Sequence, residues 1–446
     1  MRSVATTAHL PAPDRMSAAW ATLRRWRGRL LFAFADQGLF SATNFVLTIL
    51  YAAWLPIEDF GRYVVVWTAA LFIEAIQTSL IIDALPAISS HYGRRNRRRF
   101  DSAATWVVAG FSLGSSALLA ITAILLAERI PSYAWPVLIL ALVNPAQRFY
   151  LFVRRLCYIR DRQSVAAAAA AAYAIVSVCS AAALIALQAL TVSAAIAVSG
   201  FGAAAAIATS LLLGIGRAFR SRPSHVIWLA AKIWSASRWL TPASIVAWLI
   251  TWGIFPLIAA IGGAATAGIV RALQNLLTPI VQFNAALNLT LLPRVADNVA
   301  DHGGGYARRF ARRGTAIFTG SALVYCAIII AAAPAILPML YRKPEIAAAA
   351  ALLWPLSLTI VCEAARGASS IALLATRRTR IVFTARIAAL AAFACAGTAL
   401  GNLTGYTGVL WANAIGTAVG AAVVMAAVMM EPPPTAARQD VSRKVV

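Results

Sequence analysis

Long apolar stretches, each followed by a short polar segment, recur along almost the whole sequence. An α-helix rises about 1.5 Å per residue, so about 20 apolar residues are needed to cross roughly 30 Å of hydrocarbon. The first two such stretches are residues 30–54 and 63–85. Hydrophobic residues make up 61% of the chain and charged residues only 12%, which argues against a soluble protein of this size. The sequence therefore predicts an all-α polytopic membrane protein.

The same reasoning predicts twelve spans. The other ten are residues 102–127, 134–153, 164–188, 191–213, 240–261, 265–292, 315–340, 346–375, 381–400 and 406–430. Between the sixth and seventh spans, residues 216–238 alternate Trp228 and Trp234 with Lys232 and Arg238, as expected for an amphipathic helix in the membrane interface. Residues 1–29 are predicted to be a basic, amphipathic segment, and residues 431–446 a polar tail.

The basic residues of the loops predict the orientation. With twelve spans, 31 of the 39 Lys and Arg residues fall on the side of the N-terminus and four fall on the other side. Cytoplasmic loops of membrane proteins carry an excess of Lys and Arg. Both termini are therefore expected in the cytoplasm, and the expected location is the inner membrane of a bacterium.

An internal repeat is visible at an offset of 207 residues. It aligns Gly61 with Gly268, and it maps the second span and its arginine-rich loop onto the eighth span and a similar loop. This predicts two lobes of six spans each, residues 30–215 and 239–430, joined by the 216–238 segment around a central cavity. Parallel repeats of this kind place the substrate path between the lobes. The small pair Gly416 and Gly420 suits close helix packing within one chain or between two copies, and a monomer is expected.

Eight ionisable residues fall inside the predicted spans. They are Asp36, Glu74, Asp83, Arg148, Arg271, Glu363, Arg366 and Arg386. Exposing all of them to lipid would cost roughly 20–28 kcal/mol at ~2.5–3.5 kcal/mol each. Most must therefore face a cavity, a partner or the interface. Asp83 and Arg386 lie near span ends, where they are expected to reach the interface. Glu363 and Arg366 are three residues apart and are able to neutralise each other.

Polar residues on the eighth span mark a candidate substrate site. Arg271, Gln274, Asn275, Thr278 and Gln282 recur at helical spacing on one face. The fourth span supplies Asn144, Gln147 and Arg148, and the first span supplies Gln37 and Asn44. We expect these residues to line a hydrated cavity. Guanidinium groups match phosphate oxygens, so Arg148 and Arg271 predict an anionic substrate.

The spacing of chemically reactive residues does not indicate an enzyme. The sequence has no phosphate-binding Gly-rich loop with Lys, no nucleophile elbow and no zinc-protease helix. Its five cysteines are scattered, so neither a metal nor a cofactor is expected. Asp36, Glu74 and Glu363 are candidate proton or cation carriers, and pairing with arginine is their competing role.

Four short segments resemble a known family. Residues 36–45 (DQGLFSATNF), followed by residues 58–63 (EDFGRY), resemble the opening of bacterial polysaccharide-biosynthesis flippases of the Wzx type. Residues 271–275 (RALQN) and 292–294 (LPR) resemble the entry of the second lobe in the same family. This family belongs to the multidrug/oligosaccharidyl-lipid/polysaccharide exporter superfamily. The resemblance implies export of undecaprenyl-pyrophosphate-linked oligosaccharide, a polysaccharide or O-antigen repeat unit, by alternating access, with cation coupling in some members and no catalytic residues.

Two other functions stay open. A cation-coupled drug antiporter of the same superfamily would be expected to have an acidic, aromatic cavity, and the deep arginines count against it. A membrane glycosyltransferase or polymerase would need larger outer loops than the short ones predicted here. The expected partners are the lipid-linked oligosaccharide, membrane lipids and other polysaccharide-assembly proteins, and nucleic acid is not expected.

Overall fold

The computed structural model describes residues 15–90, 97–215, 221–238, 240–376 and 378–430, and within these ranges it contains helices and no strand. The helices of the first half are α1 (Arg15–Trp54), α2 (Ile57–Gln77), α3 (Ala84–Ser90), α4 (Arg97–Arg129), α5 (Pro131–Ile159), α6 (Gln163–Ala186) and α7 (Val192–Leu212). The remaining helices are α8 (Pro223–Ser237), α9 (Leu240–Thr251), α10 (Ile254–His302), α11 (Gly304–Tyr341), α12 (Pro344–Ala348), α13 (Leu353–Ala375), α14 (Thr379–Thr404) and α15 (Tyr406–Met429).

Ten stretches of the described chain are long and apolar enough to cross a membrane. The all-helical, multi-pass prediction is confirmed at this level. Helix α1 is not among the ten, and residues 240–301 count as one stretch of 62 residues. That stretch is interrupted at Gly263, whose φ of 83° and ψ of 164° are not helical and suit a residue without a Cβ. The predicted number of twelve therefore stays a prediction.

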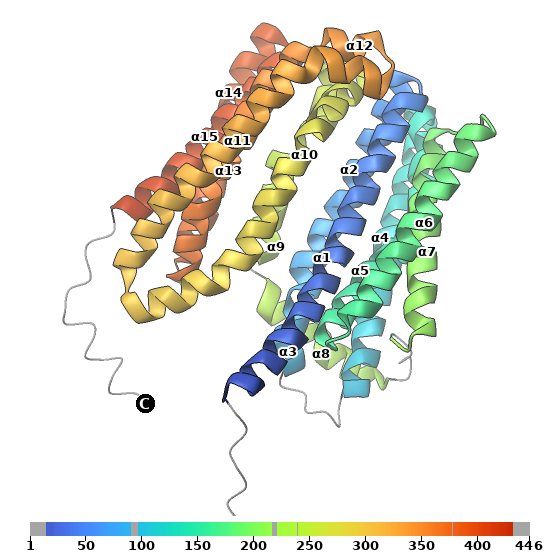
Figure 1. Cartoon of the computed structure of the whole chain (residues 1–446). Helices are drawn as coiled ribbons and strands as arrows, with labels where there is room; N and C mark the ends of the chain where they lie inside the picture. The colour runs from blue at the N-terminus through green and yellow to red at the C-terminus, as the bar shows by residue number, and fades with distance from the viewer. Residues whose placement is uncertain (1–14, 91–96, 216–220, 239, 377, 431–446) are drawn as a thin grey trace, which may run out of the picture.

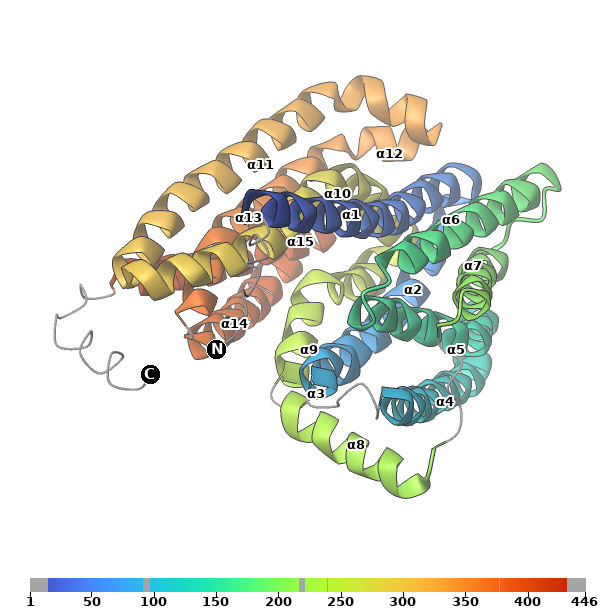
Figure 2. The same cartoon turned by 60° about the horizontal axis from the view of Figure 1, so that its bottom comes forward.

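The helices form two groups that meet at one end of the molecule (Figure 1). Helices α1–α7, blue to green, are the first helix group, and helices α9–α15, yellow to red, are the second helix group. The groups meet near α12 and diverge toward the opposite end, where α8 lies. We call these the α12 end and the α8 end. Figure 2 shows α8 running across the lower ends of α3 and α4.

One apolar core joins the two groups near the α12 end. It contains Tyr51 and Phe60 from the first group and Phe255, Leu273 and Tyr341 from the second, each 1% exposed or less. In water, helices associate mainly because apolar side chains are removed from solvent. In lipid, close van der Waals packing between the helices takes over this role. This core fixes how the two groups meet.

Within the core, α2 crosses α10 at the two glycines that the internal repeat aligns. A Cβ on Gly61 would lie 1.7 Å from the carbonyl oxygen of Ala264, and a Cβ on Gly268 would lie 2.9 Å from that of Ile57. Only glycine permits this approach at Gly61, because real Cβ atoms do not come so close to a backbone oxygen. The two positions that the predicted repeat aligns therefore lie against each other.

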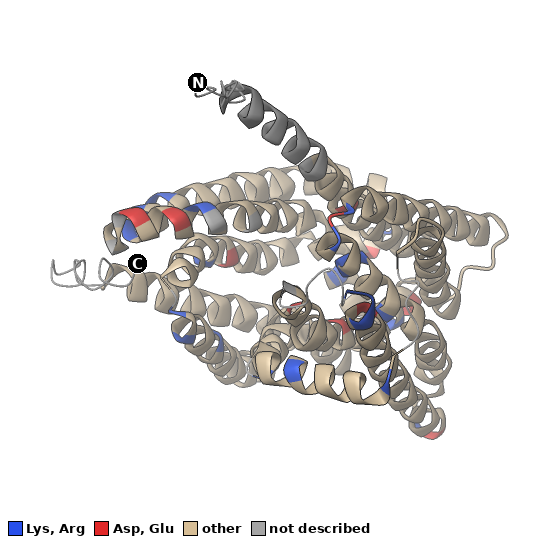
Figure 3. Cartoon of the chain, turned by 90° about the horizontal axis from the view of Figure 1, so that it is seen from below, with Lys and Arg blue, Asp and Glu red and all other residues tan. Residues whose placement is uncertain are grey.

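One sequence prediction about element limits needs correction. Helix α1 begins at Arg15, within the segment predicted to be amphipathic, but α10 and α11 run through residues 294–313, the arginine-rich loop expected after the eighth span. Arginine has a high helix propensity, so a helix continues beyond an apolar span when no breaker follows. The only break in the described part of this region is Gly303, with a φ of 72°. Figure 3, a view from below, shows Lys and Arg on the helix ends that face the viewer.

Other predictions fit the structure. Helix α8 falls within residues 216–238, where an amphipathic helix was expected. Gly416 and Gly420 pack against Ala389 and Phe393 of α14. The two glycines therefore allow close helix packing within one chain. Residues 1–14 and 431–446, predicted as part of the basic segment and the tail, lie outside the described residues.

Candidate functional site

A cavity of about 480 Å³ lies between the two helix groups. We call the residues contributed by α1–α7 its first wall and those contributed by α9–α15 its second wall. Nine of the ten residues predicted as substrate contacts line it: Gln37, Asn44, Gln147, Arg148, Arg271, Gln274, Asn275, Thr278 and Gln282. The helical spacing read from the sequence therefore brings these side chains to one cavity.

Asn144 is the exception. Its side chain is fully buried and its amide donates hydrogen bonds to Ser115 Oγ at 2.8 Å and Ser116 Oγ at 3.1 Å. It also approaches the carbonyl oxygen of Ser112 at 3.3 Å. These serines belong to α4, so Asn144 points between two helices and away from the cavity. A buried amide takes the nearest partners, and the serine-rich turn of α4 supplies them.

The α10 stripe dominates the second wall. Arg271 donates a hydrogen bond of 2.8 Å to Gln274 Oε1, and its guanidinium carbon lies 4.9 Å from the ring centre of Trp252. Asn275 reaches the carbonyl oxygen of Phe45 on α1 at 3.4 Å. In the described part of the chain, no carboxylate forms an ion pair with Arg271. No acidic residue of the described chain therefore balances its positive charge.

Arg148 occupies a different environment in the first wall. It is only 1% exposed, and its Nη2 lies 3.8 Å from Glu74 Oε2 and 3.4 Å from Gln147 Oε1. Its Nε and Nη1 are buried and have no hydrogen-bond partner among the described residues. Glu74 is the more accessible member of the pair, with its side chain 36% exposed. The carboxylate, rather than the guanidinium, is the group that this pair presents to the cavity.

Two further charged groups extend the second wall. Glu363 and Arg366 form an ion pair on α13, which is the mutual neutralisation that their spacing allowed. Arg386 was expected to reach the interface from a span end. Instead it is half-buried, lines the cavity and donates to the carbonyl oxygen of Ala243 at 3.2 Å. Among the described residues, no carboxylate pairs with Arg386 either.

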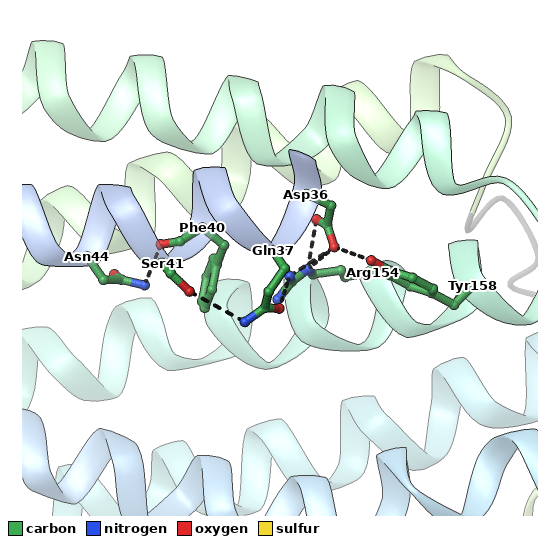
Figure 4. Close-up of polar contacts among 7 residues, drawn as sticks. All are labelled: Asp36, Gln37, Phe40, Ser41, Asn44, Arg154 and Tyr158. Carbon is green, nitrogen blue, oxygen red and sulfur yellow. Dashed lines mark hydrogen bonds and ion pairs between the residues drawn. The ribbon is translucent and has the colours of Figure 1, made fainter. Parts of the chain in front are cut away.

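Asp36 sits behind the first wall in a hydrogen-bonded cluster (Figure 4). It is fully buried, and both of its carboxylate oxygens accept from Arg154 Nε at 2.9 Å. Tyr158 donates a third hydrogen bond at 2.6 Å, and Arg154 Nη2 donates to Gln37 Oε1 at 2.8 Å. Arg154 also lies over the ring of Phe40, 4.6 Å from its centre. All three candidate carriers, Asp36, Glu74 and Glu363, are thus paired with an arginine.

Sequence reasoning missed Arg154 and the aromatic part of the first wall. Arg154 was counted among the basic loop residues, although its spacing of four from Tyr158 places both on one face of α5. Phe40, Tyr150 and Tyr173 form a ring cluster on the cavity, with ring centres of Tyr150 and Tyr173 5.3 Å apart. No sequence pattern indicated that these three rings meet.

The α12 end is closed by contacts between the groups. Lys343, between α11 and α12, donates to the carbonyl oxygen of Leu55 at the end of α1. Burial lowers the pKa of Lys343, and the neighbouring Glu345 opposes this shift. Arg342 lies over the ring of Trp54, 5.9 Å from its centre. Together with the Gly61–Gly268 crossing, these contacts separate the cavity from the α12 end.

The fold of this chain is similar to that of known membrane transporters of solved structure. No known family profile and no curated relative matches the chain. Among solved structures, an inward-facing multidrug resistance MATE family transporter of the MOP superfamily is similar over 94% of this chain and 99% of its own, with a TM-score of 0.77 and 11% identity. Lipid II flippase MurJ, in an inward closed conformation, is similar over 90% of this chain and 88% of its own, with a TM-score of 0.68 and 14% identity.

The similarity also depends on conformation. An outward-facing structure with the same MATE description has a TM-score of only 0.58, at 13% identity over 90% of this chain and 93% of its own. The arrangement of helices is therefore more similar to that of the inward-facing structure. These descriptions name transporters and a flippase and no enzyme, which agrees with the prediction that the chain is not an enzyme. The chain has the fold of MOP-superfamily transporters.

Proposed function

We propose that this chain exports an undecaprenyl-pyrophosphate-linked oligosaccharide, a polysaccharide or O-antigen repeat unit, by alternating access. The observation that carries the proposal is the charge of the cavity. Its lining contains four guanidinium groups and two carboxylates, and in the described chain Arg271 and Arg386 have no acidic partner. Such a surplus favours an anionic group over a cation.

Pyrophosphate suits this site in both charge and geometry. Planar guanidinium forks bind phosphate oxygens through two parallel hydrogen bonds. A volume of about 480 Å³ lies within the usual range for ligand pockets and suits a pyrophosphate with its first sugar. The rings of Tyr173 and Trp252 supply apolar faces against which a sugar can pack. The lipid chain would stay outside this volume, among the membrane acyl chains.

The wider organisation that we propose follows the predicted plan. It consists of two six-span lobes, residues 30–215 and 239–430, joined by the 216–238 segment. The contact of Gly61 with Gly268 supports it, because corresponding glycines of the two repeats meet. The loop charges support cytoplasmic termini in a bacterial inner membrane, so the cavity would face the cytoplasm from the α8 end. We expect the chain to act as a monomer alongside other polysaccharide-assembly proteins.

A cation-coupled drug antiporter is the second candidate. The partly exposed carboxylate of Glu74 and the ring cluster of Phe40, Tyr150 and Tyr173 favour it, because organic cations bind carboxylates and aromatic faces. The two functions predict that transport depends on side chains of opposite charge. An anionic substrate depends on Arg271, whereas a cationic substrate depends on Glu74.

Complementation tests the proposal directly. The gene is expected to restore surface polysaccharide to a strain that lacks its own flippase, and Arg271→Ala is expected to weaken this rescue strongly. Arg129→Ala, at an exposed arginine at the end of α4, is the matched control and should rescue fully. Membrane levels of each variant are measured by immunoblot. Efflux of a cationic dye that depends on Glu74, without rescue of polysaccharide, would replace the proposal with the antiporter.

A further inference from the structure

A second cavity lies at the α8 end, separate from the central one. It measures about 800 Å³ and lies between the beginnings of α4 and α8. Arg99 and Trp106 of α4 form one side, and Arg222, His225 and Ile227 form the other. None of these residues lines the central cavity, so the proposed transport function does not use them.

The lining of this second cavity is basic. It contains two guanidinium groups, one imidazole and, among the described residues, no carboxylate. Arg99 and Arg222 are both exposed, and neither forms an ion pair with any described acidic residue. Asp101, the carboxylate closest to Arg99 in the sequence, is held by Arg160. The charge of this cavity is therefore available to an anion.

A polar atom in the wall also lacks a partner. The hydroxyl oxygen of Ser221 is shielded from solvent and has no hydrogen bond within the described part of the chain. Buried polar groups are normally hydrogen-bonded, and an orphan group is a place where an absent ligand or water is expected. An oxygen-rich anion in the cavity would be able to accept from this hydroxyl.

Helix α8 places the cavity at the level of the membrane interface. One side of α8 packs Leu229 and Ile233 into an apolar cluster with residues of α4. Its other side exposes Ile227 (69%) and Trp234 (60%). A helix with apolar residues on both sides, lying across the ends of the spans as in Figure 2, is covered on its open side by lipid. Tryptophan is enriched at this depth, where the headgroups lie.

We propose that this cavity binds the phosphate headgroup of an anionic phospholipid from the surrounding leaflet. Arg99 and Arg222 hold the phosphate, and Trp106 and Ile227 contact the first part of the acyl chains. The adjoining apolar surface favours a lipid over free phosphate, because a free anion leaves that surface uncovered. Arg99 belongs to the first helix group and Arg222 precedes α8, so one bound headgroup ties α8 to α4.

Native mass spectrometry of the full-length protein in detergent tests this site. Wild type is expected to retain added phosphatidylglycerol roughly tenfold more tightly than the Arg99→Gln/Arg222→Gln double variant, since each lost arginine removes charge-assisted hydrogen bonds. Arg129→Gln, which removes an exposed arginine at the other end of α4, should retain the lipid like wild type. Phosphatidylcholine is expected to bind wild type and the double variant equally.

Three results would overturn the proposal. One is equal retention of phosphatidylglycerol by wild type and the double variant. Another is equal loss in Arg129→Gln, which would mean a general effect of charge. The third is binding of inorganic phosphate alone with the same arginine dependence, which would assign the site to a free anion. If the double variant does not fold, the wild-type protein alone still tests the proposal. In direct competition, a site for anionic lipid must retain phosphatidylglycerol in preference to phosphatidylcholine.

Discussion

The two walls of the central cavity balance their charges differently. In and behind the first wall, Asp36 is paired with Arg154 and Glu74 with Arg148. In the second wall, the carboxylate of Glu363 is paired with Arg366. The other two arginines of this wall, Arg271 and Arg386, have no described acidic partner. Buried pairs keep a structure specific, whereas an uncompensated charge at a cavity surface attracts a counter-ion. From this difference we propose a mainly structural role for the first wall and anion binding by the second.

The largest effect is expected from breaking the ion pair behind the first wall. Asp36→Asn leaves the mostly buried Arg154 guanidinium without its carboxylate, which should destabilise the protein by about 3–5 kcal/mol. Fluorescence-detected thermal unfolding in detergent measures this loss. Asp36→Asn/Arg154→Gln, which removes both charges, should recover most of it. If Asp36→Asn unfolds like wild type but loses transport, Asp36 is an ion carrier and the structural role is wrong.

The second wall should respond in activity rather than in stability. Arg271→Ala removes charge-assisted hydrogen bonds to the substrate, worth about 2 kcal/mol, so the rate of export should fall roughly 30-fold. Arg271→Lys keeps the charge without the fork and should retain an intermediate rate. Arg148→Ala should mainly lower the amount of folded protein, because its guanidinium is 1% exposed. A normally folded Arg271→Ala protein with full export would remove the basis of the comparison.

Substitutions at Gly61 and Gly268 compare how closely the two helix groups pack on each side of the point where α2 crosses α10. Gly61→Ala places a Cβ against the Ala264 carbonyl, and overpacking of this kind costs about 1–3 kcal/mol. Gly268→Ala meets the Ile57 carbonyl at 2.9 Å, so it should cost less. Thermal unfolding of the two variants side by side measures the difference. Equal costs would mean that the backbone at Gly61 adjusts freely.

The smallest effect is expected at Glu363. Its side chain is 39% exposed and its partner Arg366 is on the same helix, so Glu363→Gln should change stability by less than about 1 kcal/mol. Freeing Arg366 adds positive charge to the second wall, and substrate affinity should rise slightly. Titration of export rate against substrate concentration detects this change as a lower KM. A large loss of export would instead indicate that Glu363 carries a coupling ion.

Periodicity predicted the parts of the site that depend on one helix. Arg271, Gln274 and Thr278 share a face of α10 because a helix fixes the direction of residues three and four apart. The same rule failed for Asn144, since the serines of α4 turned its amide away from the cavity. Arg154 was missed because its partner, Asp36, is 118 residues away in the sequence. Spacing within one helix says nothing about the register between two helices.

The crossing of Gly61 with Gly268 has a consequence for how such a chain can be assembled. Gly61 lies against Ala264 and Gly268 against Ile57, which are corresponding positions at the 207-residue offset, so the contact is self-complementary like that of a two-fold dimer. Cutting the backbone between residues 216 and 222 would leave two fragments whose matching faces still fit. Co-expressing the two fragments would therefore allow hybrid proteins to be made. In such a hybrid, one fragment is exchanged while the contact around Gly61 and Gly268 is kept.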